Sequence, residues 1–212
     1  MDIANGVQQA VPVTIVTGFL SVGRSNLVNR ILNEDHGLRA AVLVNDFSEI
    51  NIDAELVVGV ESNVIVLANG CVCCQVRDDL VQALRDLLAR FQPLEYILLE
   101  VSVAERFGIS LTFLDPSLRD RIRLESVACV VDADQIFLYP DCPDLQQLML
   151  REIGFSDVVI LSNVDLLEDV EVETVKAWLS IHVEGVPIVE ASYCDVPYEM
   201  FLGVAAPSPP DG

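Results

Sequence analysis

Short apolar runs alternating with helical patterns are the feature of this sequence that most restricts its fold. The expected strands are the Val-, Leu- and Ile-rich runs 13–17, 40–45, 64–68, 96–100, 127–131, 158–162 and 187–190. The expected helices are 25–33, 78–91, 145–153 and 170–182. Strands that alternate with helices are typical of repeated βαβ units. The sequence therefore predicts an α/β fold, a three-layer α/β/α domain around a mostly parallel sheet, with ligands at the carboxyl ends of the strands.

The two ends of the chain differ from its middle. We expect residues 1–11 to be a disordered leader and residues 12–204 to form one domain. Residues 205–212 are rich in proline and have the composition of a linker, so we expect a disordered tail.

Charge excludes two classes of partner. The formal net charge is -21, whereas nucleic-acid binding requires clustered Lys and Arg, and an anionic membrane surface would repel the chain. No apolar stretch approaches the roughly 20 residues of a membrane-spanning helix, and no basic segment follows Met1 to mark a secretory signal.

Three of the six cysteines crowd into four positions, and Cys129 falls inside an apolar run, where we expect a small buried hydrophobe. These features favour a reduced, cytoplasmic protein.

A glycine-rich turn follows the first apolar run and reads Gly18-Phe19-Leu20-Ser21-Val22-Gly23-Arg24-Ser25. Two glycines with four residues between them, then a cation and a hydroxyl, match the P-loop pattern that holds phosphates with backbone N–H groups. Ser25 would place its hydroxyl on Mg²⁺. The predicted nucleotide contacts here are Gly18, Ser21, Gly23, Arg24, Ser25 and Asn26. A glycine-rich turn without a ligand is the alternative.

Arg24 stands where the P-loop pattern has lysine. A lysine ammonium is a slim point charge that reaches the phosphates, whereas arginine is a wider planar fork and does not replace it simply. The only lysine of the chain is Lys176, far along the sequence. We therefore expect weakened nucleotide binding.

Further segments carry a resemblance to a known family. Residues 26–32, 43–53 and 130–133 and the run Asn69-Gly70-Cys71-Val72-Cys73-Cys74, together with the glycine-rich turn, resemble the G domain of the CobW-type GTPases. The likeness runs from about residue 12 to residue 204. It implies a P-loop NTPase fold and a GTP hydrolase that binds Zn²⁺ or a related ion such as cobalt and delivers it to a client metalloprotein. Members usually carry a further C-terminal domain, which we expect to be absent here.

The resemblance also identifies nucleotide residues, at several of which this sequence departs from the family. Glu100 would act with Ser25 to organise Mg²⁺ and the attacking water, but the family glycine that follows is replaced by Val103. The guanine motif, normally Asn-Lys-x-Asp, reads Ser162-Asn163-Val164-Asp165, so Asp165 is kept. Ser48 replaces a family glycine.

These replacements predict weak binding and hydrolysis of GTP and a weak preference for guanine. Two alternatives stay open: a pseudo-GTPase scaffold without nucleotide turnover, and an enzyme that uses another nucleotide such as ATP. The client protein and the formation of a homodimer are left open as well.

Cys71, Cys73 and Cys74 offer three thiolates within four residues. Thiolates at this density suit Zn²⁺ or Cu(I). In the family, the segment of Glu49 takes part in metal-linked switching, so Glu49 is the expected fourth ligand, with Asp46 as the second choice. The alternative is that the three cysteines are buried packing residues or redox thiols.

Overall fold

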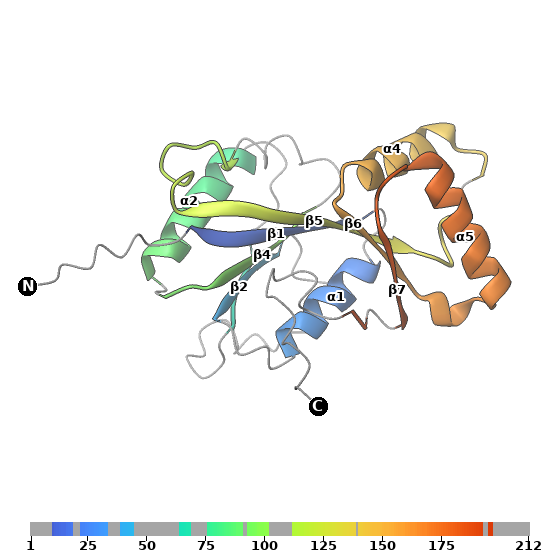
Figure 1. Cartoon of the computed structure of the whole chain (residues 1–212). Coiled ribbons are helices and arrows are strands. Elements are labelled where there is room, and N and C mark those ends of the chain that lie inside the picture. The colour runs from blue at the N-terminus through green and yellow to red at the C-terminus, as the bar shows by residue number, and fades with distance from the viewer. Residues whose placement is uncertain are drawn as a thin grey trace, which may run out of the picture.

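The computed structural model describes residues 10–18, 22–33, 39–44, 64–68, 76–90, 93–101, 112–138, 140–192 and 195–196. Within these residues, seven strands form one sheet in the order β3-β2-β4-β1-β5-β6-β7, and every pair of neighbours is parallel. Figure 1 shows the sheet with its helices. The expected α/β fold is confirmed.

The elements follow the predicted order closely. The strands are β1 (Val11–Gly18), β2 (Ala40–Val44), β3 (Val64–Ala68), β4 (Tyr96–Glu100), β5 (Ile122–Asp132), β6 (Val158–Ser162) and β7 (Ile188–Ala191). The helices are α1 (Val22–Asn33), α2 (Val76–Arg90), α4 (Pro143–Gly154) and α5 (Asp169–His182), with a short 3₁₀ turn η4 (Val164–Leu166).

Two strands are longer than the apolar runs predicted. β1 begins at Val11, the last residue of the expected leader, and Val11 pairs with Ile122 of β5. The backbone N–H of Val11 also donates to the carbonyl of Arg121 at 2.8 Å. Pairing with a partner strand therefore extends both strands, and an irregular register between Val13 and Thr14 accommodates the extra length.

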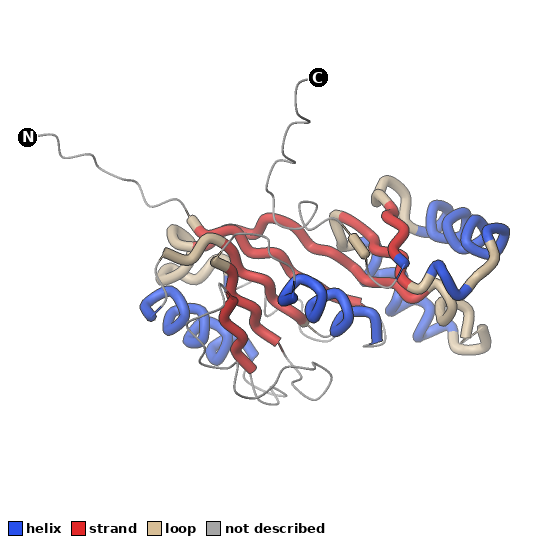
Figure 2. Tube along the Cα trace, turned by 90° about the horizontal axis from the view of Figure 1, so that it is seen from below, coloured by secondary structure: helices blue, strands red, loops and turns tan. Residues whose placement is uncertain are grey.

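Helices cover both faces of the sheet, because successive side chains of each strand point to opposite faces. Val16 packs with Leu27, Val28 and Ile31 of α1, which lies in front of the strands in Figure 2. Ile15 packs on the other face with α2. On that same face α4 and α5 cover β5 and β6, and Cys129 is buried there, which confirms its predicted role as a core residue.

Because the strands are parallel, their carboxyl ends all lie at the same edge of the sheet. β1 ends at Gly18, β4 at Glu100, β5 at Asp132 and β6 at Ser162, so these four residues lie along the carboxyl edge. α1 begins at Val22, three residues earlier than expected, which places Arg24 in its first turn. None of the helices in the described ranges is long and apolar enough to cross a lipid bilayer.

Candidate nucleotide site

The glycine-rich turn leaves the sheet at Gly18. A Cβ atom on this residue would collide with the carbonyl oxygen of Val130 in β5 and would lie 3.3 Å from Cγ of Arg24. A carbonyl oxygen of a neighbouring strand cannot move aside easily, so β1 approaches β5 this closely only because position 18 has no side chain. The aliphatic stem of Arg24 passes directly over Gly18.

Arg24 points inward, toward the end of β4. Its Nη1 donates a hydrogen bond of 2.6 Å to the carbonyl oxygen of Val101, and its Nε lies 3.9 Å from Oε1 of Glu100. Both residues are buried, with exposed fractions of 8% for Arg24 and 5% for Glu100. Nε of Arg24 has no hydrogen-bond partner among the described residues. The structure thus brings together the residue at the P-loop lysine position and the predicted catalytic carboxylate as an ion pair.

This pairing differs from what a P-loop lysine does. The lysine of that pattern reaches the β- and γ-phosphates of a nucleotide. Here two contacts of the guanidinium are made with the protein, one with a carboxylate and one with a backbone carbonyl. Buried charges are costly unless they are paired, so Arg24 and Glu100 stabilise each other.

The two replaced residues of the guanine motif are held by β5. The hydroxyl of Ser162 donates to the carbonyl oxygen of Val131 at 3.2 Å. Asn163 has a left-handed backbone, with φ 59° and ψ 28°, which asparagine tolerates better than most residues. Its Nδ2 donates to Oδ2 of Asp132 at 3.0 Å, and Oδ1 of Asp132 accepts the backbone N–H of Asp134 at 3.1 Å. Asp132 therefore braces this loop, a role the sequence did not indicate.

Asp165 borders an open pocket of about 500 Å³. The pocket is lined by residues of η4, α5 and β7 and of the loops beside them: Val164, Asp165, Leu167, Asp169, Val172, Glu173, Glu190 and Ser192. Ser192 directly follows β7, and no feature of the sequence singled it out. Asp165, from η4, is exposed at the border of this pocket.

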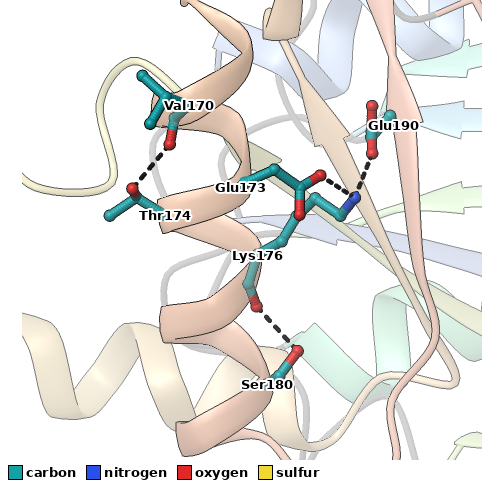
Figure 3. Close-up of polar contacts among 6 residues, drawn as sticks. All are labelled: Val170, Glu173, Thr174, Lys176, Ser180 and Glu190. Atoms are coloured by element: carbon teal, nitrogen blue, oxygen red, sulfur yellow. Dashed lines mark hydrogen bonds and ion pairs between the residues drawn. The ribbon is translucent and has the colours of Figure 1, made fainter.

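Lys176 lies beside this pocket and joins α5 to β7. Its Nζ is 2.7 Å from Oε1 of Glu173 and 2.7 Å from Oε1 of Glu190 (Figure 3). Hydrogen bonds that the ammonium of Lys176 donates to Glu173 and Glu190 raise the pKa of Lys176 above its ordinary value. The single lysine of the sequence is therefore engaged at this end of the sheet and does not replace the P-loop lysine.

Several predicted residues lie outside the described residues. They are Ser21, Asp46, Ser48, Glu49, Cys71, Cys73, Cys74 and Val103. Asn26 is exposed on α1. Gly23 and Ser25 belong to the first turn of α1.

Among the residues that the structure describes, no group of three or more His, Cys, Asp or Glu could hold a metal ion. The thiolate site remains a prediction.

The described strands fix where the expected metal-binding segments begin. β2 and β3 are parallel neighbours, and Val44 at the end of β2 pairs with Ala68 at the end of β3. The segment with Glu49 follows β2, and the segment with Cys71 follows β3. Both leave the sheet at the edge that contains Gly18. β4 alone separates β2 from β1 in the sheet. The end of β2 therefore lies about 10 Å from the end of β1 at the usual strand spacing.

The sequence did not identify a buried carboxylate that contacts the end of β1. The hydroxyl of Thr17 donates to Oε1 of Glu152 in α4 at 2.5 Å. Glu152 belongs to the buried face of α4, beside Met149 and Ile153. The sequence did contain one signal of this burial, because Glu152 is adjacent to Met149 and Ile153 on the apolar face of the helix. The partner of Glu152, Thr17, could not be identified from the sequence.

The chain is similar to proteins of known name. The model of the family "CobW/HypB/UreG, nucleotide-binding domain" matches residues 12–190. The zinc chaperone CobW of Pseudomonas aeruginosa is 32% identical in an alignment 225 residues long, and the alignment spans 92% of this chain and 60% of that protein. The zinc-regulated GTPase metalloprotein activator 1 of Dictyostelium discoideum is 30% identical over 204 residues, covering 79% of this chain and 43% of that protein.

A solved structure agrees with the fold. The Zn(II)-bound YjiA GTPase of E. coli superposes with a TM-score of 0.70 at 23% identity, over 91% of this chain and 61% of that chain. At this identity the likeness shows the fold. The chain spans between 43% and 61% of the length of these relatives. Because the family model covers most of the chain, this protein belongs to the CobW/HypB/UreG family and contains its nucleotide-binding domain.

Proposed function

We propose that this protein acts in metal trafficking: it binds Zn²⁺ or a related ion at Cys71, Cys73, Cys74 and Glu49 and passes the ion to a client metalloprotein. The names of its relatives, zinc chaperones and a zinc-regulated metalloprotein activator, support this proposal. The observation that carries it is the parallel pairing of Val44 with Ala68. This pairing starts both ligand segments side by side, at the edge where the glycine-rich turn begins.

The donor set fits a borderline metal ion. Three thiolates and one carboxylate can complete the four-coordinate sphere that Zn²⁺ prefers, with Asp46 as the other carboxylate within reach along the chain. The ion is cargo here, so it must also be released. Protonation of the thiolates weakens such a site, and affinity therefore falls as the pH decreases.

The nucleotide part of the proposal is a weakened GTPase. Catalysis in this class depends on positioning and charge stabilisation, for which Glu100 and Ser25 would organise Mg²⁺ and water. Mg²⁺ fits poorly beside Glu100, because the guanidinium of Arg24 already pairs with that carboxylate at 3.9 Å. Ser162 and Asn163, which stand where the family has Asn and Lys, both donate hydrogen bonds to β5.

A second candidate, a pseudo-GTPase scaffold, is favoured by the same ion pair. It would bind metal or a partner protein in the cytoplasm without turning over GTP. The two candidates differ in one measurement, which is steady-state release of phosphate from GTP in the presence of Zn²⁺ and Mg²⁺.

The experiment that tests the proposed function is a zinc competition titration against a chromophoric chelator. The variant Cys71→Ser/Cys73→Ser/Cys74→Ser should lose the tight site. Cys142→Ser is the matched control, because Cys142 is an exposed cysteine beside α4 and outside the expected ligand set. Equal zinc affinity of the triple variant and the control would contradict the proposal.

A further inference from the structure

The pocket between η4, α5 and β7 has the size of a small-molecule site. Its volume of about 500 Å³ lies in the range of about 300–1,000 Å³ that is typical of such sites. Aliphatic side chains form part of its lining, together with the hydroxyl of Ser192. The rest of the lining consists of four carboxylates, those of Asp165, Asp169, Glu173 and Glu190.

This lining favours a ligand that brings hydrogen-bond donors. An ionised carboxylate only accepts hydrogen bonds, and four carboxylates repel an anionic group. The phosphates of a nucleotide carry negative charge and have no donor to offer, so they do not fit here. The base of a nucleotide does fit, because a purine base combines a flat apolar body with ring N–H and amino donors at its edge. The pocket therefore suits the base and excludes the phosphates.

Two of the four carboxylates are tied together by Lys176. Its Nζ lies 2.7 Å from Oε1 of Glu173 in α5 and 2.7 Å from Oε1 of Glu190 in β7 (Figure 3). Two carboxylates this close to one point repel each other, so without the ammonium they would move apart or one would take up a proton. Lys176 therefore keeps both carboxylates ionised and in place at the pocket.

Glu190 depends on this ammonium for its place in the pocket wall. It lies on the same face of β7 as Ile188, which packs in the core cluster that contains α5. β7 pairs with β6 and is the last strand of the sheet among the described residues. A carboxylate has two oxygens, so Oε2 of Glu190 can accept a hydrogen bond from a ligand while Oε1 contacts Lys176.

We propose that Glu190 is a specificity-determining residue of this pocket, which accepts a hydrogen bond from the amino group of a purine base, and that Lys176 is the positioning residue that holds Glu190 there. The proposal deepens the proposed function and rests on it in one respect, namely that the chain binds a nucleotide. Glu190 then supplies base discrimination beside a guanine motif that has lost two of its residues.

The test compares guanosine diphosphate with inosine diphosphate by isothermal titration calorimetry. The two nucleotides share their ribose and phosphates and differ only in the 2-amino group, so the ratio of their affinities reports the contact with that group. A change that merely destabilises the protein does not alter this ratio. Wild type should bind the guanosine nucleotide about tenfold more tightly, as expected for a hydrogen bond to a charged acceptor.

The variants follow the contact from the base to the lysine. Glu190→Ala should lower the ratio to about threefold or less, because the acceptor is gone. Lys176→Met keeps the aliphatic stem, removes the ammonium and should lower the ratio to about the same extent. Lys176→Arg should restore it to within about twofold of wild type, since a guanidinium also contacts two carboxylates. In the Glu190→Ala background, Lys176→Met should change the ratio by less than about twofold.

Arg119→Met is the matched control for the lost positive charge. Arg119 precedes β5 at the opposite edge of the sheet, where its side chain is 63% exposed beside Asp120. This variant should keep the wild-type ratio. All of these variants should fold, because exposed ion pairs contribute little to stability, and their thermal midpoints should lie within a few degrees of wild type.

Three results would overturn the proposal. The first is a wild type that does not discriminate between the two nucleotides, which includes the case in which it binds neither. The second is a Glu190→Ala variant that keeps the wild-type ratio, because Glu190 then does not contact the amino group. The third concerns Lys176: an unchanged ratio in Lys176→Met, no recovery in Lys176→Arg, or a full loss in the Glu190→Ala background would refute its action through Glu190.

Zinc titration of the same proteins separates this inference from the proposed function. A wild type that binds zinc and shows no discrimination between the nucleotides would overturn the roles of Glu190 and Lys176 and leave metal trafficking standing. The predicted ratios in a protein without a zinc site would refute metal trafficking and leave both roles standing.

Discussion

The hydroxyl of Thr17 donates a 2.5 Å hydrogen bond to the carboxylate of Glu152. Thr17 directly precedes Gly18, and Glu152 comes from α4, 135 positions along the chain. Both side chains are buried, with Glu152 only 2% exposed. The start of the glycine-rich turn is therefore held by α4 on one face of the sheet, while Arg24 holds it from β4.

Thr17→Val should destabilise the protein by about 2–3 kcal/mol, because it keeps the shape of the side chain and removes a donor from a buried carboxylate. Urea denaturation measures this. Thr174→Val is the matched control, since Thr174 is exposed on α5 and its hydroxyl donates only to the carbonyl of Val170 (Figure 3). That variant should change stability by less than about 0.5 kcal/mol, and equal losses in the two would contradict a special role for Glu152.

Gly18→Ala should destabilise the protein by about 1–3 kcal/mol, because the new Cβ would collide with the carbonyl oxygen of Val130 and press on the stem of Arg24. Gly154→Ala offers the opposite case within α4. A Cβ there would meet only Cγ1 of Val183, at 3.8 Å, so this variant should keep or slightly raise the stability. Thermal unfolding of both variants checks the contrast, and a neutral Gly18→Ala would show that β1 and β5 can separate freely.

Tyr96 predicts a loss of stability at alkaline pH. Burial of its phenol, which is hydrogen-bonded to Thr14, raises its pKa from 10.0 to about 12. The folded state then holds the phenol proton that the unfolded state releases, so stability is complete below pH 10 and falls as the pH rises toward 12. Two pKa units correspond to about 2–3 kcal/mol.

The check is urea unfolding from about pH 9 to about pH 11.5, compared with Tyr96→Phe. The phenylalanine variant starts less stable, because it loses the bond to Thr14, but it should lack this part of the alkaline decline. Parallel pH profiles of stability for the two proteins would show that folding does not raise the pKa of Tyr96.

Much of the fold followed from the sequence because parallel strands are buried on both faces. Runs such as Tyr96–Glu100 and Val158–Ser162 are apolar up to their last residue and buried throughout, so their bounds matched the structure. The first half of β5 was not predicted, because it is not a continuous apolar run. It contains Arg123 and Glu125 at the margin of the sheet, and only its pairing with β1 makes it a strand.

The candidate site was predictable in part. The glycine spacing located the turn after β1, and the family resemblance identified Glu100, which ends β4 at the same edge of the sheet. The direction of Arg24 was not predictable, since it depends on a carboxylate and a carbonyl more than 70 residues away. The bond of Asn163 to Asp132 depends likewise on β5 and β6 pairing in register.

X-ray absorption at the zinc edge of the zinc-loaded protein shows whether the cysteine segment binds the transported metal. The spectrum should contain three sulfur ligands at about 2.3 Å and one lighter ligand, with the sulfur signal lost when Cys71, Cys73 and Cys74 are replaced by serine. A shell of oxygen and nitrogen ligands without sulfur would contradict metal binding by this segment.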